Sequence, residues 1–311
     1  MVSSSHNRRE FLKTLARGTV GLGLAHTALA QSGGAQITAL KLADNYTLLS
    51  GAGSNVLVVH GPEGVLMVDG GLAEQSAELF KAVTGLSPEG RIQALFNTHW
   101  HVEHTGANDL AGKSGSKIIA HENTKLWMGA EIISMWQHRT YQPRPKGARP
   151  NTTFYTTGKM NFGKEEVRYG YLGQAHTDGD IYVFFPGPNI LMTGDVFTVG
   201  TYPILDYTTG GWIGGLSDAA KTLVGLVDAQ TRIIPGSGPV QTKADLEAQA
   251  GMLATMRTRF VEMMRKGMSA KDMLAATPTK EFDAKWGNPE LFITNAYPGL
   301  WGHVREIGGI V

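Results

Sequence analysis

The stretch His99-Trp100-His101-Val102-Glu103-His104 contains three imidazoles and one carboxylate within six residues, directly after the apolar run Ile92 to Phe96. Zinc in proteins is bound by neutral imidazole nitrogens and by carboxylate oxygens. If the first residues of this stretch continue a strand, His99 and His101 lie two residues apart and point to the same face. The hexapeptide therefore predicts a metal site at the end of an apolar strand.

The hexapeptide resembles the HxHxDH signature of the metallo-β-lactamase superfamily, and three further segments resemble features of that family in the same order. They are an early strand ending in an Asp-Gly turn, a loop with a third histidine ligand, and a strand ending in a metal-bridging aspartate: Val65 to Gly71, Gly173 to Asp180 and Leu191 to Asp195. The resemblance covers nearly all of residues 37 to 240. It implies an α/β fold, a four-layer αββα sandwich with mixed sheets.

The resemblance also implies two metal sites, which are not equally complete in this chain. Site one keeps three histidine ligands: His99, His101 and His176. In site two, Glu103 replaces the usual aspartate of the signature, and Ser237 stands where the family places its last histidine ligand. A neutral serine hydroxyl is not an ordinary zinc ligand, so site two keeps at most Glu103, His104 and the bridging Asp195. We therefore expect one firmly bound zinc and a second that is weak or absent.

The chemistry follows from site one, because three histidine ligands leave the fourth position of zinc open, and water bound there has a pKa of about 7. The expected function is a zinc-dependent hydrolase whose hydroxide attacks an ester, lactone, lactam or thioester; the family hosts all of these, so it names no single substrate. Asp195 is the candidate to orient the water. Glu103, or a water on a weakly held second metal, is the candidate acid for the leaving group.

Two other functions remain open at this point. A mononuclear iron oxygenase is possible because two histidines and one carboxylate with open positions form a facial triad for iron. A non-catalytic metal-binding relative is possible if the site has decayed at Glu103 and Ser237.

The composition is that of a well-packed enzyme with one catalytic domain, since 42% of the residues are hydrophobic and 18% are charged. The net charge of +1 is unevenly spread: four cations and Glu10 give +3 in the first thirty residues, which leaves −2 for the remainder. We therefore expect a small-molecule substrate and no nucleic-acid partner. Cysteine is absent, so any metal must rest on nitrogen and oxygen ligands. Nothing in the sequence indicates an oligomeric state.

The first thirty residues resemble a twin-arginine export signal. Arg8 and Arg9 are followed by Phe11-Leu12, by the mildly apolar segment Gly18 to Ala25 and by the small-residue end Ala28 to Ala30. The alternative is a basic amphipathic helix. The apolar segment is too short and too interrupted to span a bilayer stably. We expect residues 1–30 to be the signal, residues 31–311 the catalytic domain, and the mature protein to be periplasmic or secreted.

Hydrophobic patterning predicts two β-rich halves with helices outside. Strands are expected at 37–42, 46–49, 55–60, 65–69, 92–96, 116–120, 166–172, 181–185, 190–192 and 232–234, and helices at 73–83, 216–228 and 243–266. The basic, proline-rich passage 142–150 lies between the halves and is either a lid or anion-attracting rim over the active site or a solvated connection. The segment 202–212, rich in glycine and aromatic residues, is expected to line the substrate pocket.

Other polar residues support smaller predictions. Asp69 and Asp180 are candidates to hold histidine tautomers, because an imidazole ligand usually donates its second N–H to a carboxylate or carbonyl. The remaining histidines have no ligand-like neighbours and are interpreted as structural or surface residues: His60, His121, His138 and His303.

Overall fold

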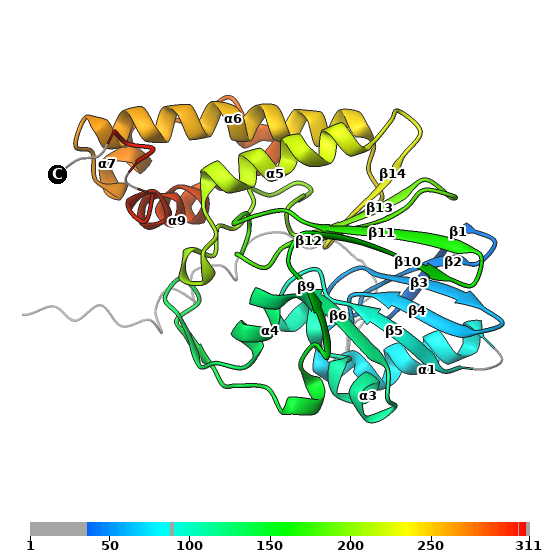
Figure 1. Cartoon of the computed structure of the whole chain (residues 1–311). Coiled ribbons are helices and arrows are strands. Elements are labelled where there is room, and N and C mark those ends of the chain that lie inside the picture. The colour runs from blue at the N-terminus through cyan, green and yellow to red at the C-terminus, as the bar shows by residue number, and fades with distance from the viewer. Residues whose placement is uncertain (1–35, 88–89, 304, 309–311) are drawn as a thin grey trace, which may run out of the picture. The chain divides into compact units, whose positions relative to one another are not determined.

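Two β-sheets lie face to face, and helices cover the outer face of each sheet (Figure 1). This computed structural model describes residues 36–87, 90–303 and 305–308. All of them belong to one compact unit, Ala35–Val311, whereas the predicted export signal lies outside the described residues. The arrangement confirms the predicted α/β class and its αββα layering. None of the described helices combines the length and the apolar character needed to cross a bilayer.

The first sheet is mixed. Its strands, in spatial order, are β1 (Thr38–Ala43), β2 (Tyr46–Ser50), β3 (Val56–Gly61), β4 (Gly64–Val68), β5 (Ile92–Phe96), β6 (Lys117–His121) and β9 (Thr152–Phe154). The strands from β1 to β4 pair antiparallel as a meander, and those from β4 to β9 pair parallel. The parallel strands place their carboxyl ends at one edge of the sheet, where the histidine-rich stretch begins.

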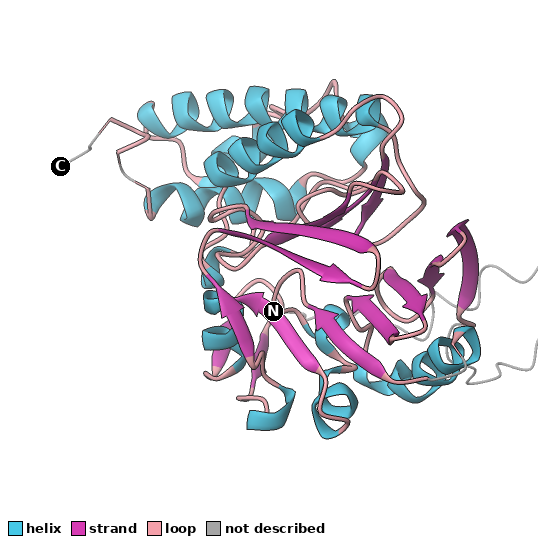
Figure 2. Ribbon diagram, turned by 45° about the vertical axis from the view of Figure 1, so that its right-hand side comes forward, coloured by secondary structure: helices cyan, strands magenta, loops and turns pink. Residues whose placement is uncertain are grey.

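The second sheet is antiparallel except at one edge. Figure 2 shows the strands of the sandwich between the helices that lie outside them. Its strands are β10 (Thr157–Phe162), β11 (Glu165–Tyr171), β12 (Ile181–Phe185), β13 (Ile190–Gly194) and β14 (Arg232–Pro235), the last pair being parallel. A separate ribbon pairs β7 (Ile132–Ser134) with β8 (Arg139–Tyr141). The patterning did not predict β7, β8, β9 or β10. The first three have only three residues each, too few to show alternation.

The helices lie on the outside of the sandwich, and the three predicted ones are present with ends shifted by up to three residues. The full set is α1 (Ser76–Leu86), α2 (Val102–Thr105), α3 (Asn108–Lys113), α4 (Glu122–Met128), α5 (Ile213–Leu226), α6 (Lys243–Arg265), α7 (Ala270–Ala275), α8 (Asp283–Trp286) and α9 (Glu290–Trp301). Helix α6 starts at a capping box, in which Thr242 and Asp245 each accept the other's backbone N–H.

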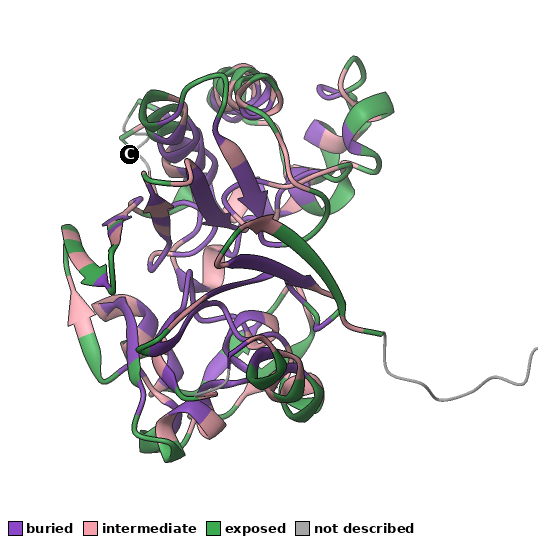
Figure 3. Ribbon diagram, turned by 90° about the vertical axis from the view of Figure 1, so that its right-hand side faces the viewer, coloured by how far each residue is buried: buried purple, intermediate pink, exposed green. Residues whose placement is uncertain are grey.

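Strand alternation explains how the layers hold together. Leu57 and Val59 point into the core between the sheets, whereas Val56 and Val58 point outward to the core beneath α1. Figure 3 shows the central strands buried and the outer helix faces exposed. Each fully buried side chain of this size contributes roughly 1.5–3 kcal/mol, and the two faces of one strand thereby join three of the four layers.

Candidate metal centre

The sequence suggested that the histidine-rich stretch continues the apolar strand, but in the structure it lies beyond the end of β5. The strand ends at Phe96, residues 97–100 are irregular, and His101 is the residue that precedes helix α2. The imidazoles still meet, because the chain turns sharply into the helix: the rings of His99 and His101 lie 4.7 Å apart between centroids. The expectation that both side chains share a strand face was wrong, but the expectation that they converge is confirmed.

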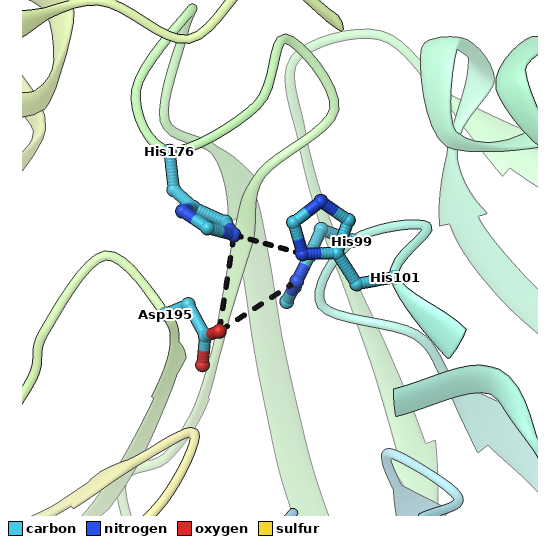
Figure 4. A group of neighbouring side chains, drawn as sticks. All are labelled: His99, His101, His176 and Asp195. Carbon is cyan, nitrogen blue, oxygen red and sulfur yellow. Dashed lines mark hydrogen bonds and ion pairs between the residues drawn. The ribbon is translucent and has the colours of Figure 1, made fainter. Parts of the chain in front are cut away.

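Four side chains from three loops meet at the edge between the sheets (Figure 4). His101 Nδ1 lies 3.1 Å from His176 Nε2, and Asp195 Oδ2 lies 3.8 Å from the same nitrogen and 4.0 Å from His99 Nε2. One nitrogen or oxygen of each of the four residues lies within 4.8 Å of the others. The three histidines named for site one and Asp195 therefore form one cluster with metal-ligand spacing.

A second group shares Asp195 with the first. Glu103, His104 and Asp195 also offer ligand atoms within 4.8 Å of one another. His104 Nε2 lies 3.3 Å from Asp195 Oδ1, whereas Oδ2 of the same carboxylate faces the first cluster. Asp195 is thus placed between the two groups. Ser237 belongs to neither group; it is exposed on the loop after β14 and lines the cavity beside Asp195.

Hydrogen bonds set the tautomer of each imidazole. His101 Nε2 lies 3.0 Å from Asp206 Oδ2, and because an ionised carboxylate only accepts, Nε2 carries a proton; in the neutral ring, the form that binds a metal, Nδ1 keeps its lone pair. By the same reasoning His176 donates from Nδ1 to the carbonyl of Ile204 at 2.7 Å, which leaves Nε2 free. The facing atoms His101 Nδ1 and His176 Nε2 are then both lone-pair bearers, an arrangement that a cation between them would stabilise.

Asp69 has the supporting role that the sequence suggested. Its Oδ2 accepts from His104 Nδ1 at 2.8 Å and from Thr98 Oγ1 at 2.9 Å. Thr98 Oγ1 in turn lies 3.1 Å from His99 Nδ1. Because the Thr98 hydroxyl already donates its hydrogen bond to Asp69, its oxygen accepts a hydrogen bond from His99 Nδ1–H. His99 Nε2 is then the free acceptor, and it is buried without a hydrogen-bond partner among the described residues. A metal cation at this point fits the donor set, which consists of nitrogen and oxygen only.

Asp180 does not hold a histidine side chain, which was one of the two roles that the sequence left open for it. Its two oxygens accept from the backbone N–H and the hydroxyl of Thr177, both at 2.8 Å, and so stabilise the turn after His176. Burial raises the pKa of Asp180 to about 7. The residue that the sequence interpretation missed is Asp206, which binds His101 and also accepts from Thr209 Oγ1 at 2.7 Å and Trp136 Nε1 at 3.1 Å. An isolated aspartate in the segment 202–212 was the only available signal.

Electrostatics distinguish the histidines. Burial, together with the neighbouring imidazoles, lowers the pKa of His99 and of His176, so both are neutral, as metal ligands must be. Burial also opposes charge on His101 and His104, but the carboxylates around them raise the pKa of both above the ordinary value. Asp195 is only partly buried, and His104 and the other imidazoles hold its pKa well below the usual range against the opposing effect of desolvation. The cluster as a whole attracts positive charge.

A cavity of about 240 Å³ opens beside His176 and Asp195. Its other lining residues come from the loop after β13, from the loop after β14 and from the segment 202–212: Phe197, Thr198, Val199, Thr201, Tyr202, Ile204, Ser237 and Gly238. Two residues of the predicted pocket segment, Tyr202 and Ile204, therefore reach it. Its mostly apolar wall beside a polar cluster is typical of a small-molecule site.

The four histidines predicted to be structural or surface residues belong to no metal-spaced group of the described chain. His121 illustrates the structural role: its Nδ1 accepts from the backbone N–H of Asn123 at the start of α4, and its ring stacks on Tyr171 at 3.8 Å between centroids.

Residues 49–236 match the metallo-beta-lactamase superfamily, and the chain belongs to this family. It is 27% identical over 162 residues to the 2,4-dinitroanisole O-demethylase subunit alpha of Nocardioides sp. (strain JS1661), a match that spans 50% of this chain and 46% of that protein. The fold resembles a metallo-beta-lactamase from Pontibacter korlensis (TM-score 0.57, 18% identity, 70% of this chain and 99% of the other). It also resembles the stereoselective inverting sec-alkylsulfatase of Pseudomonas sp. (TM-score 0.66, 15% identity, 86% of this chain and 50% of the other).

Proposed function

We propose that this protein is a zinc-dependent hydrolase that cleaves an ester, lactone, lactam or thioester at the cluster of His99, His101, His176 and Asp195. The observation that carries the proposal is the convergence of unprotonated ring nitrogens on one point, with His99 Nε2 buried and unpartnered among the described residues. A zinc ion held there would lower the pKa of a bound water to about 7 and so supply hydroxide at neutral pH.

The residues of the chain have distinct roles in this proposal. The three histidines hold the metal, and Asp206 fixes the tautomer that makes His101 Nδ1 a ligand. Asp195 lies against both groups and orients the water. Glu103, whose side chain is 34% exposed and lies 3.9 Å from His101 Nδ1, is placed to move a proton to the leaving group and exchange it with solvent. The apolar cavity beside Asp195 receives the substrate.

The second metal position is weaker in the same proposal. Glu103, His104 and Asp195 can hold an ion only in part, because the resemblance places a histidine ligand at the position of Ser237, whose hydroxyl is not an ordinary zinc ligand. We therefore propose one firmly bound zinc and a second that is weak or absent.

A second candidate is a mononuclear iron oxygenase that removes a methyl group from oxygen. Its reaction is suggested by the similarity to an O-demethylase subunit, whose name specifies loss of a methyl group from oxygen but no metal and no oxidant; the similarity covers only half of this chain. Two histidines and Asp195 would supply the facial triad that such an enzyme uses. The identity of the bound metal separates the two candidates.

We also propose that residues 1–30 are an export signal and that the catalytic domain, residues 31–311, acts in the periplasm or outside the cell. The paired Arg8 and Arg9 ahead of an apolar segment support this proposal.

The test combines metal analysis with a substrate panel. Protein purified without added metal is analysed for zinc and iron, then assayed on a chromogenic lactam, a lactone, a 4-nitrophenyl ester and a thioester. His101→Ala and His176→Ala should lose both metal and activity, whereas the matched control His60→Ala, outside the cluster, should keep both. Iron in place of zinc, or full activity of His101→Ala after chelation and zinc return, would contradict the proposed hydrolase.

A further inference from the structure

A second cavity, of about 310 Å³, is lined by residues of β8 and of the segment before β7 and shares no lining residue with the cavity beside Asp195. Its walls come from the residues around α2, from the end of α4, from β8 and from the start of the basic passage 142–150. Met128 and Ile132 form a buried apolar floor together with Trp100. Its volume is at the lower end of the range for small-molecule sites.

Three aromatic side chains line this cavity with their polar atoms already satisfied elsewhere. The bonds are Trp100 Nε1 to Thr209 Oγ1 at 3.0 Å, Trp127 Nε1 to Asp178 Oδ1 at 2.6 Å, and Tyr141 Oη to Gln137 Oε1 at 2.8 Å. None of these three acceptors lines the cavity. The rings are thereby fixed in orientation, and what they offer to an occupant is apolar ring surface.

Two arginines without acidic partners in the described chain line the cavity. Arg139 and Arg144 line it, and neither forms an ion pair with another described residue. Arg139 lies over the ring of Tyr141, 4.6 Å from its centroid, which leaves the in-plane N–H groups of the guanidinium free to donate. The nearby carboxylate of Glu131 accepts from the Gln142 amide at 2.9 Å instead of neutralising either arginine.

We propose that this cavity binds the aromatic ring and the negative charge of an aromatic anion. The rings of Trp100, Trp127 and Tyr141 would hold the flat apolar part by stacking, and Arg139 and Arg144 would bind a carboxylate or phenolate oxygen. A purely apolar ligand would leave both guanidinium groups unpaired, and a small inorganic anion would leave the aromatic walls uncovered. In this proposal the start of the basic passage 142–150 contributes Arg144 to the anion-binding part of the cavity.

Trp100 connects this cavity to the metal centre. Its ring lies 4.5 Å from that of His101 and 5.2 Å from that of Tyr141, so one indole touches both places. The occupant is either the aromatic end of a substrate whose other end reaches the metal, or a separate ligand that sits behind Trp100. In both cases the cavity binds an aromatic anion, and inhibition kinetics can separate the substrate from the separate ligand.

The binding test uses 2-naphthoate as the probe, by calorimetry on the full chain after chelation of metal, so that no carboxylate can bind to a metal ion. Neutral 2-naphthamide and non-aromatic cyclohexanecarboxylate are the matched ligands. We expect 2-naphthoate to bind about tenfold more tightly than either. The double variant Arg139→Gln, Arg144→Gln should lose that advantage, whereas Arg168→Gln, on β11 and paired with Glu166, should keep it.

The aromatic walls have their own test, because Tyr141→Phe keeps the ring and Tyr141→Leu removes it. The first should bind 2-naphthoate nearly as the unaltered protein does, and the second about tenfold more weakly. Equal binding of naphthoate and naphthamide, or unchanged binding in the double arginine variant, would overturn the proposal. This result does not depend on hydrolysis. Once a hydrolysed substrate is known, competitive inhibition by 2-naphthoate assigns the cavity to the substrate, and binding without competition assigns it to a separate ligand.

Discussion

Replacing Asp206 by asparagine should weaken metal binding although Asp206 is not a ligand. The carboxylate fixes the proton of His101 on Nε2 through a 3.0 Å bond and is itself held by Thr209 and Trp136. An asparagine of the same shape can present its amide N–H to His101, which would favour the tautomer with the proton on Nδ1. That proton would then occupy the position from which His101 faces His176 at 3.1 Å.

The expected loss of metal affinity can be estimated from other carboxylates that orient a histidine ligand. Loss of a carboxylate that orients a histidine ligand typically costs 10- to 100-fold in metal affinity, or about 1.4–2.7 kcal/mol. Asp206 is 1% exposed, so solvent cannot replace the missing hydrogen bond, and we expect Asp206→Asn near the upper end of this range. The measurement is zinc affinity, by titration against a competing chelator of known affinity.

Asp180→Asn is the matched control. Asp180 is buried to a similar extent, 2% exposed, and lies in the loop of His176, but its oxygens contact Thr177 and no imidazole. We expect this variant to lower thermal stability and to leave zinc affinity within about twofold of the unaltered protein. Equal losses of zinc affinity in the two variants, or an unchanged affinity in Asp206→Asn, would refute the tautomer argument.

Three further predictions concern other positions. Ser237→His should raise the zinc stoichiometry from near one toward two in metal analysis after dialysis, because an imidazole at this position would add a nitrogen to the second group. A stoichiometry that stays near one would contradict the assignment of Ser237 to the position of the missing ligand. Gly236→Ala should reduce activity at least tenfold, because the added Cβ of residue 236 would lie 1.8 Å from Asp195 Oδ1 and must displace that carboxylate. Circular dichroism should show the fold intact, and turnover equal to that of the unaltered protein would show that Asp195 is not needed in its present position. The double change Arg8→Lys, Arg9→Lys should leave uncleaved protein in the cytoplasm on immunoblots of cell fractions, and normal processing would favour another targeting route.

The sequence alone, through its patterning and its family resemblance, was enough to predict the layers and the side-chain types that gather in the cluster. Strands such as β3 and β4 show in the chain as short β-rich runs bounded by glycine, asparagine and proline, and the patterning that predicts them is a local property. The crowding of His99, His101 and His104 into one hexapeptide is equally local. For the same reason the three-residue strands β7, β8 and β9 escaped prediction, because they contain too few positions to show a period.

The partners of the ligands, by contrast, depended on tertiary structure. Asp206 is 105 residues from His101 along the chain, and no spacing rule connects them. Asp180 stands four residues after His176 and was as good a candidate partner as a turn residue by sequence, yet the turn directs its carboxylate back to Thr177. Residue types and periodicity specify which atoms can bind a metal. Which proton each imidazole carries depends on hydrogen bonds between loops, which become neighbours only when the two sheets have packed together.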